Sequence, residues 1–170
     1  LLDDAILKHE ELDAHLQAGE KYRKIDEVPF DFVRRRMSVV IEDHTGLNTL
    51  ICKGAVDEVL RLCTRVEIAG QILDVQPEHD TARRRRVDLL NEQGFRVIAV
   101  GYKEMPDAPD AEVYAVKDES DLILLGFLAF LDPPKDTAAA ALTRLHDLKT
   151  DVKILTGDNE AVTACICRQV

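Results

Sequence analysis

Residues 28–55 read VPFDFVRRRMSVVIEDHTGLNTLICKGA, and strand and turn signals alternate along them. The segment from Phe30 to Glu42 is rich in aromatic and β-branched residues, which favour an extended strand. His44-Thr45-Gly46 predicts a turn, because glycine accepts the positive φ of a tight connection. A second strand is expected at Thr49–Cys52. The stretch therefore predicts a β-hairpin.

The segments around this hairpin continue a mixture of strands and helices. Lys53-Gly54-Ala55 leads from the second strand into a helix at about 56–63, and apolar residues on both sides of Ala69-Gly70-Gln71 predict a short second hairpin. A helix opens at Pro77, runs to Gln93 and is closed by Gly94. The remaining expected elements are a helix at 4–18, a strand at Phe95–Lys103, a Pro- and Asp-rich loop at Met105–Asp110 and a buried strand at Leu122–Leu131.

The pattern changes after Asp132-Pro133-Pro134, because consecutive prolines do not fit inside a helix and mark a boundary. A helix at 136–148, a strand at 151–155, the turn Thr156–Asn159 and a helix at 160–169 follow. This order is typical of parallel, doubly wound α/β folds. Beginning almost directly in a helix also suggests that the chain was cut from a longer one.

The charge balance excludes one class of ligand. The 170 residues include 22 Lys+Arg and 32 Asp+Glu, so the net charge is 22 − 32 = −10. Non-specific nucleic-acid binding needs a positive surface, so no nucleic-acid partner is expected. Any anionic ligand must be held by a local cluster of cations.

Metal and membrane signals are weak. The four cysteines show no CxxC pair and no histidine at zinc spacing, so no metal site is predicted, and free thiols fit a reducing cytosol. The longest apolar run is Leu122–Leu131, about half of a membrane span. No signal peptide and no direct membrane contact are expected.

Two stretches suggest a nucleotide site. In an extended strand, Phe32 would share one face with Arg34 and Arg36, so that a ring could stack on a base while guanidinium groups bind phosphates. The alternative is a core phenylalanine beside solvated arginines. Lys53-Gly54-Ala55 combines a lysine with a helix N-terminus, which suits a phosphate or a nucleotide edge. An exposed lysine beside a turn glycine is the alternative there.

Two other stretches have competing interpretations. Arg83–Arg86 resembles a nucleic-acid patch, but a helix spreads four consecutive residues around its circumference, so a solvated, salt-bridged helix is the better interpretation. Asp132 and Thr156-Gly157-Asp158-Asn159 follow predicted strands, and such strand ends bind phosphates or metals in α/β sheets. Helix capping by Asp158 or Asn159 is the alternative.

The order of five motifs resembles that of the P-type ATPase family of ion pumps. The motifs cover nearly the whole chain and are Phe32…Arg34, Lys53-Gly54-Ala55, Gly94-Phe95-Arg96-Val97, Asp132-Pro133-Pro134-Lys135 and Thr156-Gly157-Asp158-Asn159. Stretches such as Val28–Val40 are most similar to the bacterial magnesium-translocating pumps.

The resemblance implies an α+β fold and two parts. Residues 1–131 would be the nucleotide-binding (N) domain, a twisted antiparallel sheet flanked by helices. Residues 132–170 would be the start of the returning half of the phosphorylation (P) domain, a haloacid-dehalogenase-like α/β piece. ATP, with Mg²⁺, is the implied ligand, and the implied partners are the remaining P domain, the actuator domain and the membrane helices of the same polypeptide. The location would be the cytoplasmic side of the bacterial inner membrane.

The resemblance also implies roles for individual residues. The nucleotide-binding set would be Phe32 stacking on adenine, Lys53 and Gly54 lining the adenine pocket, Arg34 and Arg96 near the phosphates, and Asp3 near the adenine amine. The P-domain loop that meets the γ-phosphate would be Thr156, Gly157 and Asp158, with Asp132 nearby. Many family members carry a pocket lysine after the Phe32 equivalent, for which only Arg35 and Arg36 are available here.

The expected function follows from these matches and from one absence. The Asp-Lys-Thr-Gly-Thr motif, whose Asp is phosphorylated in the family, does not occur in this sequence. We therefore expect a domain that binds ATP without turnover and positions it for transfer to that Asp. The alternatives are a haloacid-dehalogenase-like phosphatase fragment and a non-catalytic interaction domain that has lost nucleotide binding.

Overall fold

The computed structural model describes residues 21–105, 114–157 and 159–170, which form two compact units. The first unit contains the described residues up to Val75 and those of Ile98–Leu128. The second contains Gln76–Val97 and Ala129–Val170. The predicted helix at 4–18 and most of the predicted loop at Met105–Asp110 lie outside the described residues. The proposed boundary between residues 131 and 132 stays a prediction.

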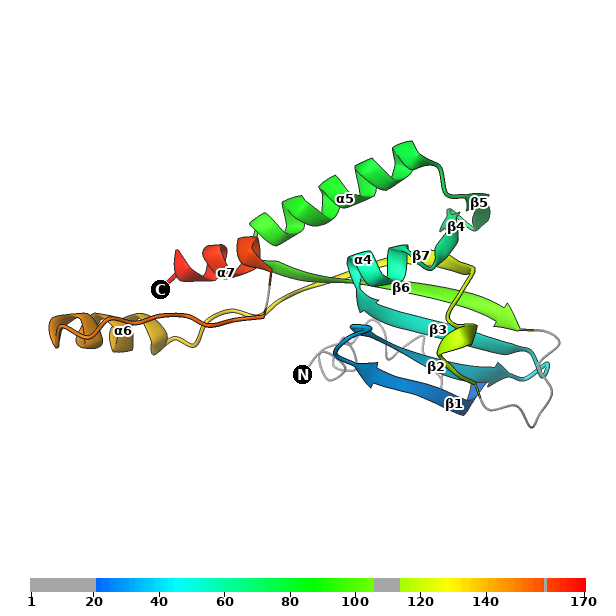
Figure 1. The fold of residues 1–170 in the computed structure, drawn as a ribbon, viewed down its shortest axis with the longest axis horizontal. Coiled ribbons are helices and arrows are strands. Elements are labelled where there is room, and N and C mark those ends of the chain that lie inside the picture. Colours follow the sequence, from blue (N-terminus) through cyan, green and yellow to red (C-terminus); the bar gives the residue numbers. More distant parts are fainter. Residues whose placement is uncertain (1–20, 106–113, 158) are drawn as a thin grey trace. The chain divides into compact units, whose positions relative to one another are not determined.

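A seven-stranded sheet organises the first unit, with the strand order β1-β2-β3-β6-β7-β4-β5 (Figure 1). Its strands, in chain order, are β1 (Tyr22–Asp31), β2 (Arg36–Asp43), β3 (Asn48–Ala55), β4 (Cys63–Ile68), β5 (Gln71–Asp74), β6 (Phe95–Met105) and β7 (Leu122–Leu131). The short helix α4 (Val56–Leu60) follows β3, and the 3₁₀ turn η1 (Val116–Asp118) precedes β7.

The sheet is mixed, which corrects the expectation of an antiparallel one. The pairs β1–β2, β2–β3, β3–β6 and β4–β5 are antiparallel. β4 and β7 run parallel, with Cys63 opposite Leu122 and Val66 opposite Leu124. Parallel neighbours need a long crossover, and the chain from β4 to β7 passes through β5, a helix and β6. Sequence patterns of single strands do not reveal this pairing.

The predicted strand Phe30–Glu42 is interrupted by a turn. Residues 32–35 form this turn between β1 and β2, because the Asp31 carboxylate accepts hydrogen bonds from the backbone N–H groups of Val33 (2.6 Å) and Arg34 (3.1 Å). The Arg35 N–H also donates to the Asp31 carbonyl oxygen at 2.6 Å, and Arg35 adopts a φ of 52°. An aspartate that binds the backbone ahead of it favours a turn over a continuing strand. The predicted turn at His44-Thr45-Gly46 is confirmed, with Gly46 at a φ of 85°.

Buried residues from several strands of this sheet form one hydrophobic core cluster. Alternate residues of β3 point into it, so that Leu50 and Cys52 have no exposed surface. Burial raises the pKa of the Cys52 thiol, which stays protonated and packs as a small apolar side chain. The other buried members are Val40, Val59, Cys63, Val66, Ala99, Tyr114, Leu122 and Leu124.

The second unit contains three helices, all near their predicted positions: α5 (Pro77–Glu92), α6 (Ala138–Asp147) and α7 (Glu160–Cys167). α5 packs against α7. Gly94 ends the α5 segment at a φ of 89°, and a Cβ at Gly94 would lie 3.0 Å from the Cys165 Sγ. The glycine is therefore required both by its backbone conformation and by this close approach.

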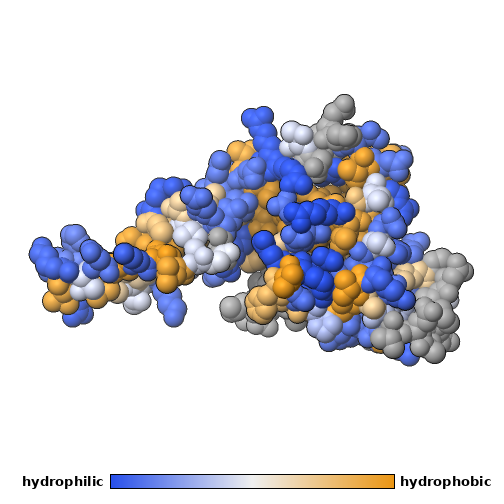
Figure 2. Space-filling view, viewed as in Figure 1, coloured by the Kyte–Doolittle hydropathy of each residue, from blue (hydrophilic) through white to orange (hydrophobic). Residues whose placement is uncertain are grey.

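The predicted strand at 151–155 is not formed. These residues have no regular secondary structure, and Val152, Ile154 and Leu155 are 47, 54 and 96% exposed. A strand is stable only beside a neighbour that completes its hydrogen bonds, and no strand pairs with residues 151–155 among the described residues. Their exposure agrees with the surface in Figure 2, where apolar residues are interspersed among hydrophilic ones. The α/β character of this segment stays a prediction.

Candidate functional site

The turn at 32–35 presents aromatic and apolar surface to solvent. Phe32 and Val33 are both 89% exposed, and Phe30 at the end of β1 is 51% exposed. The two rings meet edge to face, with centroids 5.2 Å apart and planes at 88°. Large side chains of this kind are ordinarily buried, so an exposed pair on a defined turn is a candidate binding surface.

Gly54 brings the Lys53-Gly54-Ala55 motif against this turn. A Cβ at Gly54 would lie 2.5 Å from both the Arg35 carbonyl oxygen and the Arg36 Cβ. The Ala55 N–H donates to the same Arg35 carbonyl at 2.9 Å. Only a residue without a side chain allows this approach. The structure thus joins two motifs that lie about twenty residues apart in the sequence.

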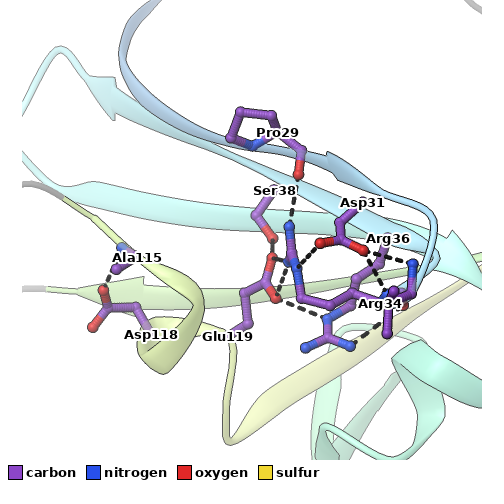
Figure 3. Close-up of polar contacts among 9 residues, drawn as sticks. Pro29, Asp31, Arg34, Arg36, Ser38, Ala115, Asp118 and Glu119 are labelled. Carbon is purple, nitrogen blue, oxygen red and sulfur yellow. Dashed lines mark hydrogen bonds and ion pairs between the residues drawn. The ribbon is translucent and has the colours of Figure 1, made fainter.

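A buried ion cluster lies under the turn, and we call Arg34, Arg36, Ser38 and Glu119 the Glu119 cluster (Figure 3). Glu119 Oε2 accepts hydrogen bonds from Arg34 Nη1 and Arg36 Nε, both at 2.8 Å. Glu119 Oε1 accepts from Ser38 Oγ at 2.7 Å and from Arg34 Nη1 at 3.0 Å. The Glu119 side chain has no exposed surface. Each carboxylate oxygen therefore has two donors, as a buried charge requires.

Arg34 is bound on its other side as well. Its Nη2 donates to the Pro29 carbonyl oxygen at 2.7 Å, and its Nε lies 3.9 Å from Asp31 Oδ2. The backbone N–H groups of Arg34 and Val33, with the nearby guanidinium groups, lower the pKa of Asp31. The guanidinium of Arg34 thus connects β1, the turn and Glu119.

The prediction that Phe32, Arg34 and Arg36 share one face of a strand is wrong. Phe32 and Arg34 lie in the turn, where the ring points outward and the Arg34 side chain, 17% exposed, points inward. Arg36 begins β2 and its side chain is only 12% exposed. Arg35 is exposed, and its side chain makes no ion pair or hydrogen bond within the part of the chain that the structure describes. Of the two arginines left open by the sequence, Arg35 is the available cation.

The remaining predicted site residues lie elsewhere. Arg96 and Asp132 both belong to the second unit, where Arg96 Nη1 lies 3.7 Å from Asp132 Oδ2. Thr156 and Gly157 are exposed in the segment before α7. Asn159 caps α7, because its Oδ1 accepts from the Ala161 N–H at 2.8 Å. Asp3 and Asp158 lie outside the described residues.

Glu119 is the residue that the sequence interpretation missed. It stands in the charged stretch at 117–121, which is typical of a solvated loop. The usable signal was in β2, where Arg36, Ser38 and Val40 alternate onto the inward face of a strand. If Arg36 and Ser38 are buried beside Val40, their donor groups need a buried hydrogen-bond acceptor. The sequence does not say which carboxylate supplies it.

Neither a metal cluster nor a membrane span is found where the structure can be described. Over 21–105, 114–157 and 159–170, no group of three or more His, Cys, Asp and Glu side chains is placed to hold a metal ion. No helix in these ranges is long and apolar enough to cross a membrane.

Comparison with known proteins identifies the family. Residues 5–137 match the family model described as P-type ATPase, cytoplasmic domain N. Over its whole length the chain is 46% identical to proteins named magnesium-transporting ATPase, P-type 1, from Salmonella typhimurium (strain 14028s) and Escherichia coli (strain K12), and it spans 19% of their length. It is 28% identical over 89% of its length to calcium-transporting ATPase 1 of Lactococcus lactis, of which it spans 17%. The chain therefore belongs to the P-type ATPase family, and residues 5–137 correspond to its cytoplasmic domain N.

Proposed function

We propose that this chain binds ATP at the turn formed by residues 32–35 and the adjoining Lys53-Gly54-Ala55 motif. The observation that carries the proposal is the exposed aromatic pair beside a glycine with no room for a side chain. Phe32 is 89% exposed, on a turn whose backbone N–H groups donate to the Asp31 carboxylate. Stacking of a base on such a ring contributes about 1–3 kcal/mol. Adenine is thus proposed to lie on Phe32, with Phe30 against the ring edge.

The phosphates require cations near that ring. Arg35 is exposed on the same turn, whereas Arg36 is engaged by Glu119. We propose Arg35 in the role of the missing pocket lysine, with Lys53 at the strand end beside Gly54. Arg34 is engaged by Glu119 and Pro29, and its role near the phosphates stays a prediction. Arg96, in the second unit, likewise stays a predicted phosphate contact, as Asp3 does for the adenine amine. Mg²⁺ enters this proposal as the counter-ion of the ATP phosphates.

The proposal for the whole protein follows from the relatives. The chain spans 19% of the magnesium-transporting relatives it matches, so further domains are expected in the same polypeptide. We propose a cation pump, with magnesium as the cargo, in which this part positions ATP for transfer to an aspartate of the P domain. Asp132, Thr156, Gly157 and Asp158 would face the γ-phosphate there. The actuator domain and membrane helices would complete the pump, with this part on the cytoplasmic side.

An NMR titration with ATP tests the binding site. Amide shifts are expected at residues 30–36 and 53–55 on adding millimolar nucleotide. Phe32→Ala should weaken binding by about 5- to 150-fold, because base stacking contributes about 1–3 kcal/mol. The loss of ATP affinity in Phe30→Ala measures the contribution of the second ring to binding.

Tyr22→Ala provides the matched control, because Tyr22 is a 48% exposed aromatic at the opposite end of β1. Its binding constant should equal that of the unaltered chain. If no amide near Phe32 or Lys53 shifts at millimolar ATP, or if Phe32→Ala and Phe30→Ala both bind as the unaltered chain does, the site is elsewhere. Binding of no nucleotide at all would favour the non-catalytic interaction domain instead.

A further inference from the structure

Glu119 is fixed by its own segment, far from the turn in sequence. The 3₁₀ turn η1 holds its backbone, since the Glu119 N–H donates to the Val116 carbonyl oxygen at 3.2 Å. The segment is fixed at its other end by Tyr114, whose N–H donates to Asp26 Oδ2 at 3.0 Å and whose hydroxyl accepts from Asn48 Nδ2 at 3.0 Å. The Glu119 carboxylate therefore has a defined position that does not depend on the turn alone.

Glu119 contacts Arg34 within the turn and Arg36 directly after it, and it makes no hydrogen bond or ion pair with Phe32 or Arg35. Arg34 lies within the turn and Arg36 is the first residue after it, and both guanidinium groups donate to Oε2 (Figure 3). Phe32 and Arg35 are exposed, whereas the side chains of Arg34 and Arg36 are largely buried. Because Phe32 is 89% exposed, its own packing fixes it little. Its position depends on the backbone conformation of the turn, which is held by Asp31 together with the side chains of Arg34 and Arg36.

We propose that Glu119 is a positioning residue for nucleotide binding: through Arg34 and Arg36 it holds the turn that displays Phe32 and Arg35, without touching the nucleotide. This inference rests on the proposed ATP site and adds a residue that lies outside it. It also assigns Arg34 to the support of the turn rather than to the phosphates. Preorganising a binding loop raises affinity by reducing the ordering needed on binding.

Two ligands distinguish positioning from direct contact. Glu119→Gln and Arg34→Ala are each titrated with ATP and with adenosine, which has the base but no phosphate. A disordered turn loses its stacking surface, so affinity for both ligands should fall by about tenfold, equivalent to about 1.4 kcal/mol. A loss confined to ATP would identify Arg34 as a phosphate ligand and overturn the inference. Unchanged affinity for both ligands would overturn it too.

The control is a glutamate in an exposed ion pair of the same hairpin. Glu42 pairs with Arg23 at 2.8 Å near the far end of β1 and β2. Glu42→Gln removes the same charge and should leave both affinities unchanged. Backbone hydrogen exchange of residues 32–35 provides a second readout without nucleotide. Faster exchange is expected in Glu119→Gln and not in Glu42→Gln, and equal exchange in both would contradict the inference.

Loss of one partner leaves buried charge unpaired, so Glu119→Gln is at risk of unfolding. A second variant, Arg34→Met with Arg36→Leu and Glu119→Leu, replaces the whole charge cluster by apolar groups, a change that often preserves stability. This folded variant should still lose affinity for adenosine as well as ATP, because the fixed arginine–glutamate geometry is gone. Adenosine binding equal to that of the unaltered chain would overturn the inference. If the unaltered chain binds neither ligand, the proposed ATP site itself fails and this inference fails with it.

Discussion

A Cβ on Gly54 falls 2.5 Å from a carbonyl oxygen and from the Arg36 Cβ, closer than real Cβ atoms come. The neighbouring atoms include backbone of the turn, so a flexible side chain cannot simply move away. In the Lys53-Gly54-Ala55 motif, the absence of a side chain at Gly54 is therefore as important as the lysine, because it lets the turn approach β3. The sequence indicated a special role for this glycine, but not that it would face the turn before β2 and its cross-strand partner Arg36.

Gly54→Ala should lower the free energy of unfolding by about 1–3 kcal/mol, because overpacking moves the turn or the β3 backbone. Urea denaturation followed by circular dichroism measures the change. Gly157→Ala is the control, since a Cβ on Gly157 would have no heavy atom of the described residues within 4 Å and its backbone is not left-handed. It should change stability by less than about 0.5 kcal/mol. Equal stability of both variants would contradict the close approach.

The turn between β1 and β2 was not predicted from the strand propensity of the segment that contains it. Aromatic and β-branched residues favoured one strand from Phe30 to Glu42, and no break in it was predicted. The break comes from Asp31, whose carboxylate binds the N–H groups of Val33 and Arg34. By contrast, α5 was predictable from Pro77 and Gly94, and β7 from its apolar run, because those signals are local.

Acid should weaken this turn. Hydrogen bonds from the Arg34 and Val33 N–H groups lower the pKa of Asp31 below its ordinary value of 3.8. A group with a lowered folded-state pKa stabilises the fold fully above its unfolded pKa, and the contribution is lost as pH falls through the folded value. The stability advantage of the unaltered chain over Asp31→Ala should thus be fully present well above pH 3.8 and shrink as the pH falls through 3.8 and below.

Urea midpoints at several pH values measure this difference, and the Asp31 carboxyl carbon shift gives the titration directly. Glu27→Ala serves as the control, because it removes a carboxylate from β1 that is remote from the turn hydrogen bonds. A pH-independent difference between the unaltered chain and Asp31→Ala, or a titration midpoint above 3.8, would exclude the proposed role of the carboxylate.

The whole molecule divides its apolar residues between a core and an exposed set. Neighbouring leucines on β7 show this clearly, since Leu124 is 1% exposed and Leu125 is 54% exposed. Most individual strands and helices could be predicted because their patterns are short, although the strand expected at 151–155 is not formed and that at Phe30–Glu42 is interrupted by a turn. The strand order, the parallel β4–β7 pair and the Glu119 cluster could not, because each joins segments far apart in the chain and depends on which faces meet.

Leu124→Ala should lower the free energy of unfolding by about 2–5 kcal/mol, the usual loss for a buried leucine. Leu125→Ala, one residue along the same strand, should change it by less than about 0.5 kcal/mol. Thermal and urea unfolding of both variants measure the contrast. Similar losses at the two positions would mean that the β7 faces are assigned incorrectly.

The Glu119 cluster has a further consequence for folding fidelity. Side chains alternate along β2, so a slip of one residue against its neighbours would turn Arg36 and Ser38 to the opposite face. Glu119 would then be a buried charge without its donors, which is strongly unfavourable. The same slip would move the buried Val40 to the opposite face, so apolar and charged residues favour the same register. A single carboxylate, contributed by a distant segment, therefore favours the native register of the β1–β2 hairpin over registers shifted by one residue.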